Sequence, residues 1–501
     1  MQKLISIIVV LVFSFQPVWL QEGDLLKNLS IEKTPEGIEE LREFLNIPND
    51  ALNIKDIEKN IDWLRKAFQD RGFSYEILQT SNTPIFLAER RFTGADKTVL
   101  FYMHFDGQGV DPPKWDQESP YKAELKKRSA NDYESISWDQ IDGLIDSELR
   151  VFARSSSDDK GPIIMFLNAV DLIDQHFKGH SSINLKVILD GEEEKGSTQL
   201  PAAVIKYHEK LQADYMIIND GPIHSSGRPT VVFGGRGLAE VNITVYGPRT
   251  AQHSGHYGNY APNPAFRLSK LLAGMKDDKG RVILPGYYDG IILDENTQNI
   301  LLSVPDDPNV IHKTIGIAEP EKVGRFYQEA LQYPSLNVRG MQSGWVGKQV
   351  RTIVPDRAEA AIDIRLVPES NPDRLVRIVK KYILEQGYYV IDREPNEKER
   401  LKYSKICKFE YEGARLPFRT QVDSDLGVWL KEVLQSGTGK EPVQVRIMGG
   451  TVPIAPFVKA LKIPAVIVPL VNNDNNQHGP NENLQVWNFT NGIHIFLAIM
   501  R

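Results

Sequence analysis

Residues 98–108, TVLFYMHFDGQ, join an apolar run to two side chains that can bind a metal ion. The run Thr98–Met103 is short and uninterrupted, which is typical of a strand buried on both faces. His104 and Asp106 follow it directly. In open α/β sheets, functional groups collect beyond the carboxyl ends of the strands. This stretch therefore predicts an α/β fold with a site at one edge of its sheet.

Three further apolar runs end in the same way. They are Leu185–Leu189 before Asp190-Gly-Glu-Glu-Glu194, Tyr215–Ile218 before Asp220, and Ile463–Leu470 before the loop from Asn472 to His478. Helical patterns separate these runs, and strands that alternate with helices are typical of an α/β protein. An earlier helical pattern covers residues 34–72. Four strand ends thus deliver carboxylates or histidine to one edge.

Length and composition restrict the function further. The chain has 501 residues, of which 41% are hydrophobic and 25% charged, so a globular protein of two to four domains is expected. The net charge is −7, without a basic stripe, and we expect no nucleic-acid partner. Cys407 is the only cysteine. Any metal must therefore be bound by His, Asp and Glu.

The N-terminus has the features of an export signal. Lys3 precedes an apolar run of 12 residues, Leu4–Phe15, which is shorter than the about 20 residues that span a bilayer. We expect a signal peptide over residues 1–21 and an exported protein, periplasmic or secreted. A retained anchor is the alternative, because residues 16–21 lack a clear small-x-small cleavage site.

The middle of the chain changes character near Leu238. The order there is an alternating strand (238–247), a helix (263–273), an irregular region (277–350), a second alternating strand (358–368) and a helix (372–386). Apolar strands return after about residue 415, so this part predicts a small α+β domain inserted into the α/β domain. We assign residues 22–236 and 413–501 to a catalytic domain and residues 237–412 to the insert.

Each polar motif alone has an ordinary structural explanation. Asp158-Asp159-Lys-Gly161 fits a turn and helix cap, Glu192–Glu194 fits a solvated face, and His478 fits a loop. Their joint occurrence after strands favours a metal site instead. An Asp placed like Asp106, two residues after a ligand His, commonly accepts the other ring N–H.

Together the motifs resemble a known family, the co-catalytic di-zinc peptidases that include carnosinases, glutamate carboxypeptidases, aminoacylases and succinyl-diaminopimelate desuccinylase. The matching text is MHFDGQ (103–108), KWDQESPY (114–121), SSSDDKGP (155–162), DGEEEKGS (190–197), IIND (217–220), HSGHYGN (253–259), DIRLVP (363–368), GGTVPI (449–454) and NDNNQHGPNENL (473–484). The carnosinase and dipeptidase branch is the most similar. The resemblance implies a two-domain α/β fold of the zinc-exopeptidase type. Its inserted α+β, ferredoxin-like domain would serve as lid and dimer contact, giving a homodimer.

The resemblance also implies five metal ligands. His104 and Asp220 would bind one zinc ion, Glu194 and His478 would bind a second, and Asp158 would bridge both. Mn²⁺ or Co²⁺ could replace zinc in such a donor set. The Asp158–Asp159 peptide bond would be cis.

Catalytic and substrate-binding roles follow from the same resemblance. The catalytic residues would be Glu193 as general base, Asp106 to orient His104, and His253, supplied by the partner subunit, to stabilise the oxyanion. The substrate contacts would be Arg365, Gly450, Thr451 and Asn263. Arg365 is suited to a substrate carboxylate because a guanidinium binds it through two parallel hydrogen bonds.

Two features depart from the family pattern. The separation of His104 and Asp158 is longer than usual, with extra residues around 126–147 that we interpret as a surface insertion near the mouth of the site. Glu192 replaces the usual bulky apolar residue, which leaves a one-residue ambiguity in the assignment of base and ligand. We prefer Glu193 and Glu194, because Gly196-Ser197 fixes the frame.

The expected function is zinc-dependent hydrolysis of amide bonds in dipeptides or short peptides, by a water shared between two metals with Glu193 as base. The alternative is an N-acyl-amino-acid hydrolase with the same metal site. A catalytically silent binding protein or a structural scaffold would not need every ligand and the base, and none of these is missing.

Overall fold

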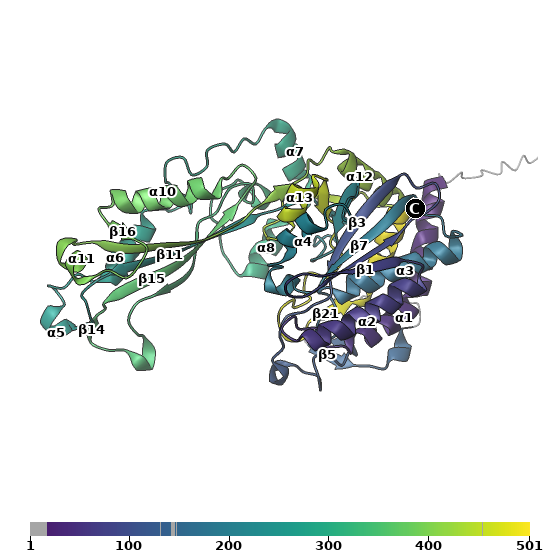
Figure 1. The fold of residues 1–501 in the computed structure, drawn as a ribbon, viewed down its shortest axis with the longest axis horizontal. Coiled ribbons are helices and arrows are strands. Elements are labelled where there is room, and N and C mark those ends of the chain that lie inside the picture. The colour runs from purple at the N-terminus through teal and green to yellow at the C-terminus, as the bar shows by residue number, and fades with distance from the viewer. Residues whose placement is uncertain (1–17, 131, 142–145, 147, 453) are drawn as a thin grey trace, which may run out of the picture.

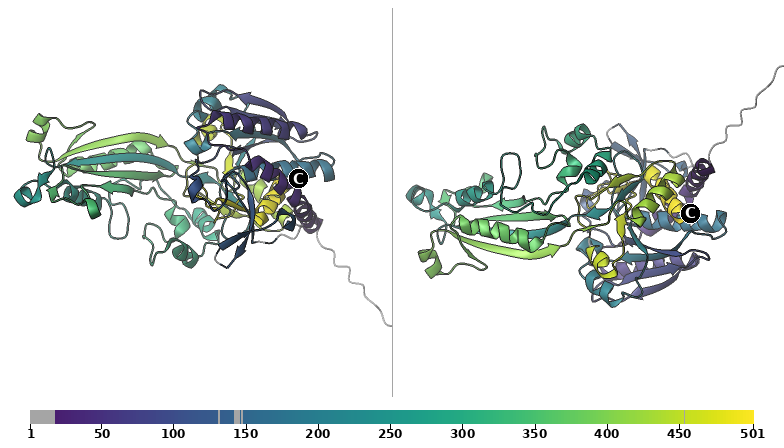
Figure 2. Two further views of the ribbon diagram at one scale, coloured as in Figure 1. Left: turned by 90° about the horizontal axis from the view of Figure 1, so that it is seen from below. Right: turned by 90° about the horizontal axis from the view of Figure 1, so that it is seen from above.

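The computed structural model describes residues 18–130, 132–141, 146, 148–452 and 454–501. These residues form two lobes, a broad one with an eight-stranded sheet and an elongated one with a five-stranded sheet (Figures 1 and 2). Residues 1–17 of the expected signal peptide lie outside the described residues, and helix α1 already begins at Val18. No helix in the described ranges is long and apolar enough to cross a membrane.

The sheet of the broad lobe has the order β1-β2-β7-β3-β8-β20-β9-β19. Its strands are β1 (Ser74–Leu78), β2 (Ile85–Arg90), β3 (Lys97–His104), β7 (Ile183–Asp190), β8 (Tyr215–Ile218), β9 (Thr230–Val232), β19 (Val443–Val445) and β20 (Ala465–Ile467). The four strands predicted to end in polar groups are the adjacent, mutually parallel β7, β3, β8 and β20. Their carboxyl ends therefore meet at one edge.

Helices cover both faces of this sheet. One face is covered by α1 (Val18–Leu45), α2 (Ile54–Asp70), α3 (Lys160–His176), α12 (Asp425–Thr438) and α14 (Val486–Met500), and the other by α4 (Leu200–Lys206) and α13 (Ala455–Leu461). Strand β3 is buried from Val99 to its end. Burial on two faces explains why its sequence is apolar without alternation.

The sheet of the elongated lobe has the order β13-β15-β11-β17-β16. Its strands are β11 (Gly237–Tyr246), β13 (Asn337–Gln342), β15 (Arg357–Leu366), β16 (Tyr389–Ile391) and β17 (Ile406–Arg415). Helices α6 (Pro264–Ala273) and α10 (Pro372–Glu385) pack on its apolar face. The smaller elements of this part are α5 (Ser254–Tyr257), α7 (Glu295–Ser303), α8 (Pro308–Ile315), α9 (Tyr327–Ala330), α11 (Glu397–Lys402), β12 (Gln252–His253) and β14 (Ile353–Val354).

A four-stranded sheet contains part of the insertion after His104. Its order is β21-β6-β4-β5, with β4 (Glu124–Ser129), β5 (Asp132–Ser135), β6 (Leu149–Phe152) and β21 (Asn483–Gln485). Because β21 follows the His478 loop directly, this sheet anchors one end of that loop. The remaining strands, β10 (Gly234–Gly235) and β18 (Phe418–Arg419), pair where the chain passes between the lobes.

The structure corrects three predicted elements. The helical pattern over 34–72 belongs to two helices, α1 and α2, which are separated by the segment 46–53 that contains Pro48, whereas Pro35 lies within α1. The strand expected over 463–470 is only β20, because Pro464 and Pro469 cannot donate to the ladder. The region 277–350, expected to be irregular, contains three helices and the edge strand β13.

Candidate metal centre

Five potential metal ligands converge at the predicted sheet edge. His104 is the last residue of β3, Asp220 follows β8 and His478 lies in the loop after β20. Glu194 lies in a single turn of 3₁₀-helix, Glu193–Lys195, after β7, and Asp158 precedes α3. These side chains form two groups, His104–Asp158–Asp220 and Asp158–Glu194–His478. Asp158 belongs to both.

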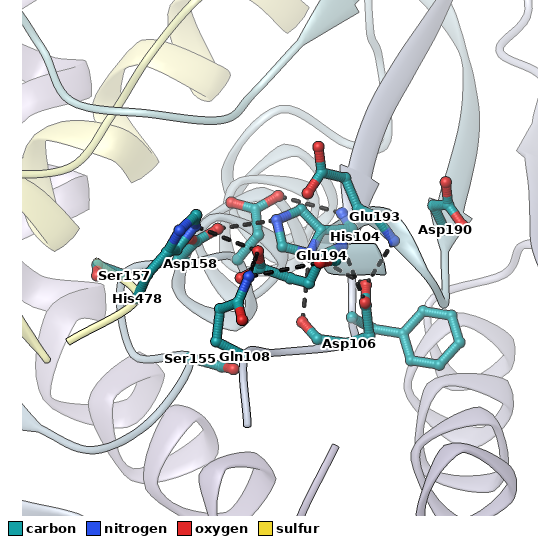
Figure 3. A network of polar contacts seen from close by, with 12 residues as sticks. His104, Asp106, Gln108, Ser155, Ser157, Asp158, Asp190, Glu193, Glu194 and His478 are labelled. Atoms are coloured by element: carbon teal, nitrogen blue, oxygen red, sulfur yellow. Dashed lines mark hydrogen bonds and ion pairs between the residues drawn. The ribbon is translucent and has the colours of Figure 1, made fainter. Parts of the chain in front are cut away.

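The side chains of His104, Asp158, Glu194 and His478 lie close together, as Figure 3 shows. His104 Nε2 lies 2.8 Å from Asp158 Oδ1, and His478 Nε2 lies 3.3 Å from Asp158 Oδ2. His478 Nε2 also lies 3.2 Å from Glu194 Oε2. Within each group the ligand atoms all lie within 4.8 Å of one another. One carboxylate thus faces both histidines, each through a different oxygen.

The electrostatics of the cluster favour a bound cation. Burial together with the neighbouring Asp158 raises the pKa of Asp220 to about 6. Hydrogen bonds to Asp158 and Glu194 raise the pKa of His478 to about 10. The carboxylates of the cluster thus repel one another. Divalent cations would relieve the same repulsion, and a donor set of carboxylates and imidazoles without thiolates fits Zn²⁺, Mn²⁺ or Co²⁺.

Asp106 connects the β3 end to the turn after β7. Its Oδ1 lies 3.3 Å from His104 Nδ1, and its two carboxylate oxygens accept hydrogen bonds from the backbone N–H groups of Glu193 (3.0 Å) and Glu194 (3.1 Å). Asp106 is fully buried, and burial raises its pKa to about 6. One side chain therefore positions both an imidazole and the acidic turn.

The three consecutive glutamates point to different partners. The Glu194 carboxylate lies in the metal-ligand cluster, whereas the Glu192 carboxylate accepts from Thr198 Oγ1 at 3.2 Å and from the backbone N–H of Gln199 at 3.3 Å. Burial and the nearby carboxylates raise the pKa of Glu193 well above its usual value. Gly196, with φ of +86°, ends the turn in the left-handed conformation that glycine adopts readily.

The Asp158–Asp159 peptide bond is cis, which confirms that expectation. The turn between β6 and α3 presents the Asp158 side chain to both histidines, while Asp159 Oδ2 accepts from the backbone N–H of His104 at 3.2 Å. Consecutive carboxylates thus face the ligand cluster and the end of β3.

Two of the four candidate substrate residues meet. Arg365 Nη1 on β15 donates to Thr451 Oγ1 at 2.8 Å, although the two residues come from different lobes. Gly450, next to Thr451, accepts from the backbone N–H of Arg236 through its carbonyl oxygen at 3.0 Å. Asn263 instead caps α6, since its Oδ1 accepts from the backbone N–H of Ala265 at 2.9 Å.

His253 lies far from the metal-ligand cluster of its own chain. It ends β12 and precedes α5, at the outer end of the elongated lobe, whereas β3 and β7 lie in the other lobe (Figure 1). Its Nδ1 accepts from the backbone N–H of Gly255 at 3.0 Å. Within one chain, the structure therefore does not bring His253 to the other candidate catalytic residues.

Residues 100–501 match peptidase family M20/M25/M40. The chain belongs to this peptidase family. It is therefore a hydrolase with a candidate metal centre at the carboxyl ends of its parallel strands.

Named relatives of this M20 chain are peptidases. It is 25% identical over 421 residues to a human Beta-Ala-His dipeptidase, covering 83% of this chain and 76% of that protein. A Cys-Gly metallodipeptidase of Schizosaccharomyces pombe is 26% identical over 421 residues, covering 82% and 81%. An M20 family metallo-carboxypeptidase of Sulfolobus solfataricus superposes with a TM-score of 0.73 at 28% identity, covering 93% and 98%.

Two residues of this M20 site had no assigned role in the sequence analysis. Gln108 Nε2 donates to Glu194 Oε2 at 2.8 Å. Glu482, four residues after His478, is fully buried and accepts hydrogen bonds from the loop that holds Asp158. Both residues lie inside family motifs, 103–108 and 473–484. Their polar contacts join segments that are far apart in the chain, and the spacing of residues along the sequence does not reveal such contacts.

Glu482 connects two loops of the M20 site. Its Oε1 accepts from the backbone N–H groups of Ser157 and Asp158, each at 3.0 Å, and its Oε2 accepts from the backbone N–H of Ser155 at 3.0 Å. Arg154 Nη1 donates to Oε2 at 2.6 Å. Both carboxylate oxygens thus accept from N–H donors. A glutamine at this position must turn its NH₂ group, which is itself a donor, toward the donors that face one of these oxygens.

Glu482→Gln is therefore expected to weaken the binding of added zinc by about 10–100-fold, because only one of the two oxygens that hold the loop 155–158 remains an acceptor. Competition with a chromogenic chelator measures this affinity. Glu118→Gln, in an exposed pair with Lys122, is the control that should bind zinc like the unaltered chain. Unchanged zinc affinity in Glu482→Gln would contradict the positioning role.

Proposed function

We propose that this peptidase hydrolyses the amide bond of dipeptides or short peptides that carry a free C-terminal carboxylate, using two zinc ions. The observation that carries this proposal is the Asp158 carboxylate shared between the two ligand groups, with Glu193 on the adjoining turn. The relatives named as dipeptidases support the substrate class. The bound metals would supply Lewis acidity, which lowers the pKa of a water molecule and polarises a carbonyl group.

In the proposed mechanism the chain holds the metals through His104, Asp220, Glu194 and His478, with Asp158 between them. Glu193 takes a proton from the attacking water and transfers it to the leaving amine. Asp106 holds the Glu193 backbone and the His104 ring in place through the contacts described above. Zinc suits this donor set, and Mn²⁺ or Co²⁺ is the alternative.

The proposed substrate contacts are Arg365 on β15 and the loop that contains Gly450 and Thr451. Arg365 would bind the C-terminal carboxylate, with Thr451 fixing its guanidinium and the Gly450 region adjoining it. Asn263 is proposed as a lid contact, and the same Oδ1 caps α6.

We further propose that residues 237–412 act as a lid and dimer contact, with residues 22–236 and 413–501 as the catalytic domain. The position of His253 supports a homodimer, since β12 and α5, on either side of this imidazole, lie at the outer end of the elongated lobe, away from β3 and β7 of the same chain. Its ring would donate to the oxyanion that forms on the substrate.

Export is also part of the proposal, either through a signal peptide over residues 1–21 or through a retained anchor. It rests on Lys3 and the apolar run that follows it.

Product analysis by mass spectrometry tests the proposed function. The zinc-loaded protein is incubated with dipeptides including β-alanyl-histidine and cysteinyl-glycine, longer peptides and N-acyl amino acids, with and without chelator. We expect chelator-sensitive loss of dipeptides and recovery after zinc is restored. Loss of N-acyl amino acids alone would replace the substrate class and keep the mechanism. No loss of any compound by the metal-loaded protein would overturn the proposal.

A further inference from the structure

A buried arginine without a carboxylate partner lies beside the proposed carboxylate site. Arg236, between β10 and β11, is 7% exposed, and Nη2 donates to the carbonyl oxygen of Tyr333 at 2.7 Å. Its Nε is buried without a hydrogen-bond partner. Among the described residues, no carboxylate lies within ion-pair distance of its guanidinium.

Other buried arginines of the chain do have such partners. Arg154, which is 2% exposed, pairs with Glu482 at 2.6 Å. Arg150, which is 5% exposed, pairs with Asp474 at 2.8 Å. Arg446, which is 9% exposed, donates to Gln332 and lies 3.9 Å from Glu369. Arg236 differs from these three in lacking an anion.

Strand register places Arg236 close to Arg365, at the start of β11. Leu238 of β11 pairs with Arg365 of β15, and Gly237 pairs with Leu366. Since side chains alternate along a strand, Leu238 shares one face with Arg365, opposite the apolar core that contains Leu366, and Arg236 lies two residues before Leu238, just ahead of β11. Diagonal neighbours on one face are within reach of long side chains.

The two arginines also meet the same loop of the catalytic lobe. The backbone N–H of Arg236 donates to the carbonyl oxygen of Gly450 at 3.0 Å, and Arg365 Nη1 donates to Thr451 Oγ1 at 2.8 Å. Burial and the nearby charge of Arg365 lower the pKa of Arg236 to about 10, so the Arg236 side chain remains cationic at neutral pH. A buried cation without a counter-charge is costly, and an anionic ligand would offset that cost.

We propose that Arg236 is a second binding group for the C-terminal carboxylate of the substrate, acting beside Arg365 and making the free carboxylate a requirement. This inference rests on the proposed function. Two guanidinium groups offer planar donor forks that match the geometry of a carboxylate. An amide at the C-terminus has neither the charge nor enough acceptors, and the site then retains its unpaired cation.

Calorimetric binding tests this assignment in the zinc-loaded Glu193→Gln background, where turnover is suppressed. The probes are β-alanyl-histidine and its C-terminal amide. We expect the free acid to bind at least about 30-fold more tightly than the amide. Adding Arg236→Met should weaken binding of the acid by about 30-fold and leave binding of the amide unchanged. Arg236→Lys, which keeps the charge and loses the fork, should fall between the two.

Stability without ligand separates a binding role from a structural one. If Arg236 gains an ion-pair partner only when the substrate carboxylate binds, Arg236→Met should keep or raise the Tm of the ligand-free protein, because a buried unpaired charge is removed. Arg446→Met is the matched control, since it removes a buried arginine that has partners. It should lower the Tm and leave the preference for the acid over the amide intact.

The possible failures are distinguishable. Equal binding of acid and amide before Arg236 is altered would overturn a carboxylate site. If the acid is preferred and Arg236→Met does not weaken its binding, the assignment of Arg236 is wrong and the proposed function stands. If Arg236→Met lowers the Tm and weakens both probes equally, the role is structural and the inference fails. Failure of the proposed function itself would be seen in the product analysis, where the unaltered chain would not hydrolyse dipeptides.

Discussion

Replacing Glu193 with Gln is expected to lower kcat by about 10³–10⁴-fold while both metals stay bound. Glutamine has nearly the same shape as glutamate but cannot take a proton from water at neutral pH. The five proposed ligands and the Asp106 contacts to the turn are unaltered, so the metal content should not change. Product formation gives kcat, and elemental analysis of the purified protein gives the metal content. Glu193→Ala should lose as much turnover.

Glu192→Gln is the matched control for this experiment. The Glu192 carboxylate contacts Thr198 and Gln199 instead of the ligand cluster, so this variant should retain most of its turnover. Loss of turnover in Glu192→Gln with activity retained in Glu193→Gln would reverse the assignment of the base by one residue. High activity in both variants would leave the mechanism without a general base on this turn.

The second large effect is expected from His253→Ala, which should lower kcat by about 10²–10³-fold, the usual cost of losing a donor to an oxyanion. His256→Ala is the control, because this neighbouring imidazole, with its ring centroid 4.8 Å from that of His253, has no proposed role. If His253 acts in its own chain, a heterodimer of His253→Ala and Glu193→Gln chains has no complete site.

If His253 acts across the dimer, the same heterodimer has one complete site. The His253→Ala chain supplies Glu193, and its Glu193→Gln partner supplies the imidazole. We therefore expect verified heterodimers to reach about half the turnover of the unaltered dimer, from two chains that are each inactive as homodimers. Heterodimers as inactive as the parent variants would contradict a histidine supplied across the subunits.

Most of the broad lobe could be predicted, because the sequence patterns that indicate its strands are local. Strands β3, β7 and β8 contain short apolar runs that are followed directly, or after one residue, by His104, Asp190 and Asp220. Two boundaries in this lobe were not predicted. A segment that contains Pro48 separates α1 from α2, and Pro464 and Pro469 shorten β20. The helices within 277–350 were missed because α7, α8 and α9 are short: α7 and α8 are mostly exposed, and the buried residues of α9 are the polar Gln328 and Glu329, so none has a long apolar stripe.

Within the site, the convergence of His104, Glu194, Asp220 and His478 follows from strand ends that share one sheet edge, and Asp158 joins them from the turn before α3. Their roles as ligands remain predictions until a metal is bound. Glu482 and Arg236 could not be found from the sequence. A buried glutamate and a buried arginine have the same letters as exposed ones, and only their surroundings distinguish an anchored carboxylate from an unpaired cation.

The order of the donors along the chain has a consequence for biosynthesis. His104, Asp158, Glu194 and Asp220 leave the ribosome first, then the whole elongated lobe, and only afterwards His478 and Glu482. A nascent chain that has not yet reached residue 478 can form one ligand group but cannot close the other. If the proposed centre is correct, the metal pair can be captured in full only after the elongated lobe has been made.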